Sequence, residues 1–201
     1  MDNNLTNVVF NKKEILNLTL ENIFLLFNRR GYTKDVPDSK LKEEFIENKV
    51  IYYENDSIKL SVIFIDSEIK NITTGSVVDD YLNKNVDFYK FILCKSFSKK
   101  VYKQVNEVYK NCEIFFNYEF MEDIPSKKFI PNHTLLNNEE KQELLQKFTL
   151  REISKIYITD MMARYYGAKV NDIFRIKRHN ISSGSSIVYR VVIPGNLDIL
   201  F

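Results

Sequence analysis

The segment Ile58-Lys59-Leu60-Ser61-Val62-Ile63-Phe64-Ile65 decides the architecture of the first half of the chain. It alternates polar and apolar residues and then becomes fully apolar, which is typical of a strand that runs into the interior of a sheet. A similar run, Tyr89-Lys90-Phe91-Ile92-Leu93-Cys94, lies downstream, and a helical pattern around Ser76 to Asn83 separates the two. Strands that alternate with helices in this way predict an α/β layer.

The alternation continues outward on both sides of this pair. Downstream, Ser98 to Tyr109 has helical spacing, and Glu113-Ile114-Phe115-Phe116-Asn117-Tyr118 is typical of another strand. Upstream, Glu14 to Arg30 has apolar residues at helical spacing and is followed by Gly31, a residue that commonly ends helices. A second short helix is expected to begin near Pro37-Asp38-Ser39.

The pattern changes at the polar, proline-containing segment Asp123 to Lys128, where we place a domain boundary. Beyond it we expect an extended Phe129-Ile130, a helix that begins at Asn137, and a short helix from Asp160 to Tyr166. Gly167 follows the short helix and is well placed for a left-handed cap.

The chain is expected to end in a β-hairpin. Its strands are Asp172 to Arg178 and Ile187 to Ile193, and Ser182 to Ser186 form the loop. The fold class is therefore α+β with two domains. Residues 1–124 form an α/β domain with a small mixed sheet and flanking helices, and residues 125–201 form a small α+β domain with the hairpin at its end.

Composition excludes several protein classes. With 44% hydrophobic and 28% charged residues, and only 5 glycines and 4 prolines among 201 residues, the chain is globular rather than fibrous or linker-like. A formal net charge of +2 shows no basic tail for nucleic acid. Residues 127–201, however, carry 12 lysines and arginines against 7 aspartates and glutamates. This excess of positive charge makes the second half the better candidate for binding the acidic surface of a partner.

Two cysteines, Cys94 and Cys112, are too few for a disulfide framework or a cysteine-rich zinc site, which fits a reducing compartment. The start, Met1-Asp2-Asn3-Asn4, lacks the pattern of a signal peptide. The longest apolar run is shorter than the roughly 20 residues of a membrane helix. We expect a soluble intracellular protein without a membrane partner.

Catalytic motifs are scarce. The two histidines, His133 and His179, have no Ser, Cys or Asp at a triad spacing, and no phosphate-binding loop or metal cluster is present, so we expect no cofactor. One pattern fits a metal-dependent nuclease: Asp66-Ser67-Glu68-Ile69-Lys70 follows a strand, and Asp56 could be a second ligand. The alternative interpretation is a solvated turn after that strand.

The second half carries an ordered series of short motifs. They are Pro131-Asn132-His133, Glu139 to Leu145, Leu150-Arg151-Glu152, Ile158-Thr159-Asp160, Ala163-Arg164-Tyr165-Tyr166-Gly167, Ile173 to Arg178 and Tyr189-Arg190-Val191-Val192. This series closely resembles subunit 5 of eukaryotic RNA polymerases, whose smaller archaeal counterpart corresponds to this half alone. The resemblance covers about residues 125–193. It is fainter in the first half, at Arg30-Gly31-Tyr32 and Leu41 to Phe45.

The resemblance implies a non-catalytic subunit of a DNA-directed RNA polymerase, present as one copy in a hetero-oligomer. Its N-terminal domain would be a jaw that projects toward downstream double-stranded DNA and contacts it nonspecifically. Its C-terminal domain would be an assembly domain that docks on the largest subunit. The jaw fold is similar to some nucleases, which would explain the pattern at Asp66, Glu68 and Lys70. The alternative function is a metal-dependent nuclease on the N-terminal domain.

Candidate site residues come from the matched motifs. The predicted partner-binding residues are Arg151, Asp160, Ala163, Arg164, Tyr165, Arg175, Lys177, Arg178, Tyr189 and Arg190, and the predicted structural residues are Pro131, His133, Gly167 and Gly184. Two alternatives stay open for Arg164, an ion pair with Asp160 or a partner contact. On the hairpin, Arg175 and Lys177 share one face and Arg178 lies on the other, and this basic strand either is solvated or docks on an acidic surface.

The sequence also departs from the family pattern. Met161 follows Asp160 where the family usually has proline, and in the loop from Arg178 to Gly184 only the arginine and the glycine match. Such divergence, in a chain rich in residues with A/T-rich codons, favours a subunit encoded by a large DNA virus. The expected location is then a viral factory or the virion, and the nucleus for a cellular protein.

Overall fold

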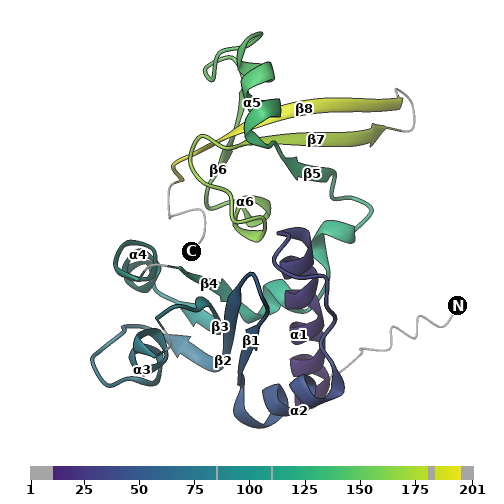
Figure 1. Cartoon of the computed structure of the whole chain (residues 1–201). Helices are drawn as coiled ribbons and strands as arrows, with labels where there is room; N and C mark the ends of the chain where they lie inside the picture. Colours follow the sequence, from purple (N-terminus) through teal and green to yellow (C-terminus); the bar gives the residue numbers. More distant parts are fainter. Residues whose placement is uncertain (1–10, 85, 110, 181–183, 196–201) are drawn as a thin grey trace, which may run out of the picture. The chain divides into compact units, whose positions relative to one another are not determined.

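The computed structural model describes residues 11–84, 86–109, 111–180 and 184–195. The chain divides into two compact units, unit 1 (Met1–Glu122) and unit 2 (Asp123–Phe201). Each unit contains a four-stranded sheet flanked by helices (Figure 1). The predicted α+β class is confirmed.

Unit 1 is built on a mixed sheet with the strand order β1-β2-β3-β4, in which β1 is antiparallel to β2 and the other pairs are parallel. Its elements are α1 (Lys12–Arg29), α2 (Ser39–Asn48), β1 (Val50–Glu54), β2 (Lys59–Ile69), α3 (Val77–Asn83), β3 (Tyr89–Phe97), α4 (Lys99–Val108), β4 (Cys112–Phe116) and the 3-10 turn η1 (Asn117–Phe120).

Helices cover both faces of this sheet. Figure 1 shows α1 on one face and the crossover helices α3 and α4 on the other. On the α1 face, Phe27 packs on Phe91 with ring centroids 5.0 Å apart. On the α3 face, the hydroxyl of Tyr81 is 2.8 Å from that of Ser61, and both residues are buried. The fully apolar strands of the sequence are therefore the ones enclosed on both sides, as expected for a parallel sheet.

Local sequence fixes where the helices begin. Asn11 and Glu14 form a capping box at the start of α1, because each side chain accepts a hydrogen bond from the other residue's backbone N–H. Asp38, Ser76 and Ser98 cap α2, α3 and α4 in the simpler way, through a backbone N–H three residues on.

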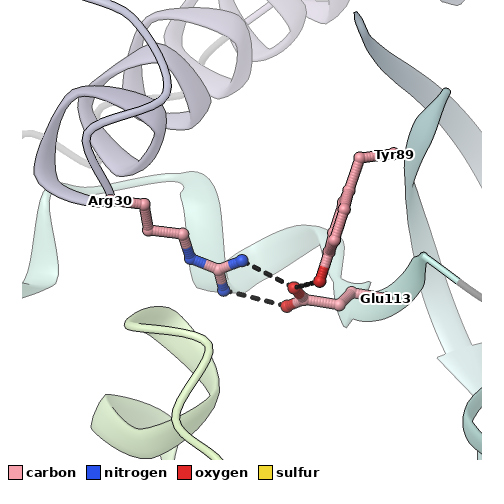
Figure 2. A network of polar contacts seen from close by, with 3 residues as sticks. All are labelled: Arg30, Tyr89 and Glu113. Atoms are coloured by element: carbon pink, nitrogen blue, oxygen red, sulfur yellow. Dashed lines mark hydrogen bonds and ion pairs between the residues drawn. The ribbon is translucent and has the colours of Figure 1, made fainter. Parts of the chain in front are cut away.

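A buried ion pair joins the end of α1 to β4. Arg30 donates two hydrogen bonds to Glu113, at 2.6 and 2.8 Å, and the hydroxyl of Tyr89 donates a third at 2.6 Å (Figure 2). The guanidinium also lies over the rings of Tyr32 and Phe91. Burial alone would lower the pKa of Arg30, but the Glu113 carboxylate raises it, so the guanidinium stays charged inside unit 1.

Unit 2 contains a second sheet with the order β5-β7-β8-β6. Its elements are the 3-10 turn η2 (Ile124–Ser126), β5 (Asn132–Leu135), α5 (Asn138–Leu145), β6 (Ser154–Tyr157), α6 (Met161–Tyr165), β7 (Ile173–Asn180) and β8 (Gly184–Ile193). β5 and β8 are antiparallel to β7, and β6 is parallel to β8.

Residues of opposite parity on β7 and β8 face two small cores. Phe174 and Val192 pack with Ala163 of α6, whereas Ile173 and Val191 pack with Leu144 of α5. Because side chains alternate along a strand, α5 and α6 cover opposite faces of the sheet, as Figure 1 shows. The expected hairpin is thus the centre of unit 2.

Several sequence-based boundaries were wrong. Strands β1 and β6 were not predicted. In β6 only Ile156 is buried, so the alternation of buried and exposed residues is too short to recognise. Phe129-Ile130 is a turn rather than extended chain, because the Ile130 N–H donates to the carbonyl of Lys127. β4 ends at Phe116 and continues into η1.

Two predicted loops are also strand. β2 continues to Ile69, because it pairs with β3 again beyond a bulge, with Glu68 opposite Ser96. β8 begins at Gly184, so residues 184–186 belong to the strand, and the rest of the predicted loop lies outside the described residues.

Candidate interaction surface

The short helix α6 is fixed at both ends by its sequence. The carboxylate of Asp160 accepts a hydrogen bond from the backbone N–H of Met162 at 2.9 Å and so caps the first turn. At the other end Gly167 has φ +63°, and the backbone N–H groups of Gly167 and Ala168 donate to the carbonyls of Arg164 and Ala163. This is a Schellman motif, and it confirms the predicted left-handed cap.

The β7–β8 hairpin presents most of the exposed positive charge in the described part of unit 2's sheet. Its described residues include Arg175, Lys177, Arg178 and Arg190 but no aspartate or glutamate. Lys177 and Arg178 are exposed, and both lie beyond the region that α5 and α6 cover. A surface of this kind attracts an acidic partner.

The hairpin charges divide between the two faces of the sheet. Phe174 lies opposite Arg190, so Arg190 and Arg178 point to the face that α6 covers. Lys177 and Arg175 point to the other face, where Arg175 makes an ion pair of 3.0 Å with Glu140 of α5. The predicted alternation of these side chains is confirmed. Glu140 was not recognised, because nothing in the sequence relates α5 to β7.

His133 lies on the same face as Arg178 and Arg190. It is 9% exposed, its Nδ1 lies 2.7 Å from the carbonyl oxygen of Pro131, and its ring packs edge-on against Phe174. A carbonyl oxygen only accepts, so Nδ1 carries the proton of the neutral ring. Burial lowers the pKa of His133, and the charges of Arg190 and Arg178 add to that lowering, whereas the hydrogen bond with the Pro131 carbonyl and the charge of Asp160 oppose it.

The predicted partner-binding residues differ widely in burial. Arg151, Asp160, Lys177 and Arg178 are exposed, Arg175, Tyr189 and Arg190 are half-buried, and Ala163, Arg164 and Tyr165 are buried. Ala163, Arg164 and Tyr165 lie beneath the surface and support its shape, but they are not part of the exposed area. Among the residues predicted to be structural, Pro131 holds His133, and Gly184 starts β8 with φ +77°.

The nuclease pattern does not form a metal site in the described residues. Asp66 makes an ion pair with Lys12 at 2.9 Å, and Glu68 lies 3.7 Å from Lys70. The hydrogen bond from Lys12 is the largest cause of the lowered pKa of Asp66. Asp56 precedes β2, whereas Asp66 lies near the end of that strand. A strand rises about 3.3 Å per residue, so the two carboxylates are more than about 20 Å apart. The expectation that Asp56 could be a second ligand was wrong.

Neither a metal-binding cluster nor a membrane-spanning helix occurs in the described part of the chain. In residues 11–84, 86–109, 111–180 and 184–195, no three His, Cys, Asp or Glu side chains are grouped as metal ligands. None of the helices within those ranges is both long and apolar enough to cross a membrane.

Comparison with known proteins identifies the family of this chain. Residues 122–192 match the family described as RNA polymerase Rpb5, C-terminal domain. The DNA-directed RNA polymerase subunit Rpo5 of the archaeon Methanothrix thermoacetophila is 40% identical over 72 residues, which cover 35% of this chain and 92% of the archaeal protein. The chain belongs to the RNA polymerase subunit 5 family.

Two members of this family match almost the whole chain. DNA-directed RNA polymerase subunit 5 of Acanthamoeba polyphaga mimivirus is 28% identical over 188 residues, 88% of this chain and 91% of the viral protein. Subunit 5B of RNA polymerases IV and V of Arabidopsis thaliana is 23% identical over 182 residues, 81% of this chain and 83% of the plant protein.

Family membership settles two expectations. The resemblance noted from the second half is confirmed, and the chain is a non-catalytic polymerase subunit rather than a free-standing enzyme. The mimivirus relative fits the expectation of a virus-encoded member.

Proposed function

We propose that the protein docks on the largest subunit of a multisubunit DNA-directed RNA polymerase through unit 2. The observation that carries this proposal is the extent of the archaeal relative, which aligns over 92% of its length with 72 residues of this chain. We take these 72 residues to be the part that matches the family model, residues 122–192. The part that all these subunits share is the part expected to hold them in the enzyme.

The surface of unit 2 suits this role. The described part of its central hairpin carries four cationic side chains without an acidic one, and Lys177 and Arg178 are exposed at its far end. Cationic side chains that meet acidic groups across an interface select the partner and its orientation. We therefore place the contact with the large subunit on the hairpin and on the adjoining face with His133 and Arg190.

Unit 1 supports the jaw around downstream DNA in this proposal. The viral and plant relatives also span unit 1, so it belongs to the larger form of the subunit. Lys99, Lys100 and Lys103 are exposed on α4 and could meet phosphates without reading sequence. Such contacts are weak and salt-sensitive in isolation. The protein then acts where its polymerase transcribes, in a viral factory or virion if a virus encodes it and in the nucleus if a cell does.

Co-purification from the native source tests the assignment. Tagged full-length protein is expected to bring down the two largest polymerase subunits, with one copy of the tagged chain per enzyme, and to stay bound in high salt. Loss of the chain at moderate salt would indicate a transient adaptor instead. Absence of both large subunits from the purified material would refute the proposed function.

A further inference from the structure

Arg190 in the middle of β8 carries a buried nitrogen atom that has no hydrogen-bond partner. The side chain as a whole is half-buried, and its Nε atom is shielded from solvent. Within the described part of the chain, no acceptor lies within hydrogen-bond distance of this Nε–H. Folded proteins pair the large majority of their buried polar atoms. The Nε–H of Arg190 is therefore a donor for which the folded chain supplies no acceptor.

The neighbours of Arg190 on the sheet supply no negative charge. Arg190 lies opposite Phe174 of β7 on one side and opposite Ser154 of β6 on the other. The first neighbour is an apolar ring, and the second is an exposed residue with a neutral hydroxyl. None of the ion pairs between described residues includes Arg190. Its guanidinium is thus a half-buried charge without a counter-charge among these residues.

Two other groups on this face strengthen the positive potential. The charges of Arg178 and Arg190 both act on His133, so both guanidinium groups lie within electrostatic range of its ring. Arg178 is exposed. The charge of Asp160 also reaches the ring, but this carboxylate already accepts a hydrogen bond from the backbone N–H of Met162 at the start of α6. A face with this balance attracts an anionic group.

We propose that an Asp or Glu carboxylate of the largest polymerase subunit binds Arg190 and accepts hydrogen bonds from its Nε–H and from a neighbouring Nη–H. The proposal rests on the proposed function and deepens it, because it assigns the docking contact to one side chain and to one kind of acceptor. A guanidinium presents its donors in a fixed planar fork, which matches the two oxygens of a carboxylate.

The burial of Arg190 favours a protein side chain over nucleic acid. A phosphate of duplex DNA belongs to a stiff double helix and cannot easily enter a half-buried position on a sheet. An Asp or Glu side chain can enter such a position and bring two acceptor oxygens to one guanidinium. The resulting pair is enclosed by both proteins, and the loss of one member of such a pair mainly speeds dissociation of the complex.

Two measurements on Arg190→Met test the proposal. Methionine matches the length of arginine as far as Nε but has no donor. In the isolated full-length chain, we expect the midpoint of urea unfolding to stay the same or rise, because the variant removes a buried donor that has no acceptor there. In pull-downs from the native source at high salt, Arg190→Met should recover the two largest subunits at least about tenfold less well.

The matched control is Lys155→Met. Lys155 is an exposed cation on β6 and lies opposite Val191, which packs on the α5 side of the sheet. The control removes the same charge from the opposite face, so it should recover as much polymerase as the natural chain.

The possible results separate the proposal from the proposed function. A clear loss of stability in isolated Arg190→Met would place the acceptor within this chain and overturn the proposal. Undiminished recovery of polymerase by Arg190→Met would overturn it too and leave the proposed function intact, also where the variant binds duplex DNA more weakly, since the acceptor would then be a phosphate. If the natural chain recovers no polymerase, both fail.

Carbodiimide cross-linking of the Arg190→Lys variant identifies the acceptor. Lysine places an amine at this position, and carbodiimide joins an amine to a carboxylate as an amide only where the two groups are in contact. In polymerase assembled at low salt, mass spectrometry should find position 190 joined to an Asp or Glu of the largest subunit. A cross-link to a carboxylate of this same chain would overturn the proposal.

The Arg190→Lys variant also tests the paired hydrogen bonds. Lysine keeps the positive charge but lacks the planar fork, so at high salt the variant should recover less polymerase than the natural chain and more than Arg190→Met. Recovery equal to that of the natural chain would overturn the assignment of Nε–H as a donor, because charge alone would then suffice.

Discussion

A single buried ion pair makes unit 1 sensitive to the loss of either partner. The side chain of Arg30 is 3% exposed and that of Glu113 is 18% exposed, and each satisfies the other with two hydrogen bonds. Taking one partner away leaves the other charge buried without compensation, which is costly in a medium of low dielectric constant. The pair therefore fixes the end of α1 against β4.

We predict that Arg30→Met lowers the free energy of unfolding of unit 1 by about 3–5 kcal/mol, as is typical when half of a buried pair is removed. The matched control is Lys42→Met, which breaks the more exposed pair with Glu21 and should cost less than about 1 kcal/mol. Urea titration of the full chain, followed by NMR signals of unit 1, measures both. Equal losses from the two variants would contradict the argument.

His133 makes unit 2 sensitive to acid. Its pKa is lowered in the folded state, so below the ordinary value near 6.5 the unfolded chain binds more protons than the folded one. Stability is then fully present above that pH and is lost as the pH falls toward the lowered folded value. His133→Asn should flatten this dependence, because the amide can still donate to the Pro131 carbonyl but does not titrate.

The chain has two histidines, so the measurement is best made in a His179→Gln background. Urea titrations between pH 7.5 and pH 5, followed by NMR signals of unit 2, should show a steep loss of stability with His133 present. The Asn variant should be less stable at pH 7.5, because the ring contact with Phe174 is lost, but should change little with pH. An unchanged slope would show that other groups cause the acid sensitivity.

At the scale of elements, α6 depends on its terminal glycine. Five residues are too few for a helix to persist without tertiary support, and its end is held by the Schellman bonds around Gly167. At φ +63° a Cβ is disfavoured, so Gly167→Ala should lower the stability of unit 2 by about 1 kcal/mol. Gly167→Asn should cost less, since asparagine tolerates this conformation better. Urea titration of both variants checks the order, and a larger loss for Asn would contradict it.

Elements with strong local signals could be predicted from the sequence, and the others could not. Asp38, Ser76 and Ser98 are residue types that commonly cap helices, and each accepts a hydrogen bond from the backbone N–H three residues later. The starts of those helices were therefore predicted to within one or two residues. β6 has one buried side chain and exists because β8 offers it an edge. No local pattern encodes such a pairing.

The candidate surface shows the same division. The alternation of Arg175, Lys177 and Arg178 follows from the strand period and was predicted. The burial of Arg164 and the pairing of Arg175 with Glu140 depend on packing between distant segments.

At the scale of the whole molecule, the two units differ in which relatives contain them. The archaeal relative aligns over almost its whole length with 72 residues of this chain, which is close to the length of unit 2, so that unit is expected to fold without unit 1. Its sheet has its own cores on both faces, formed around Phe174 on one side and Ile173 on the other. These cores lie wholly within residues 123–201.

We therefore predict that residues 123–201 alone unfold cooperatively in urea and recover the large polymerase subunits from the native source about as well as the full chain does. Residues 1–122 should fold but recover none, because the docking surface is absent, and should bind duplex DNA only weakly and at low salt. The full chain serves as the control for recovery. An isolated unit 2 that folds but captures no polymerase, beside a full chain that does, would show that docking also needs unit 1 and would move the proposed contact away from the hairpin.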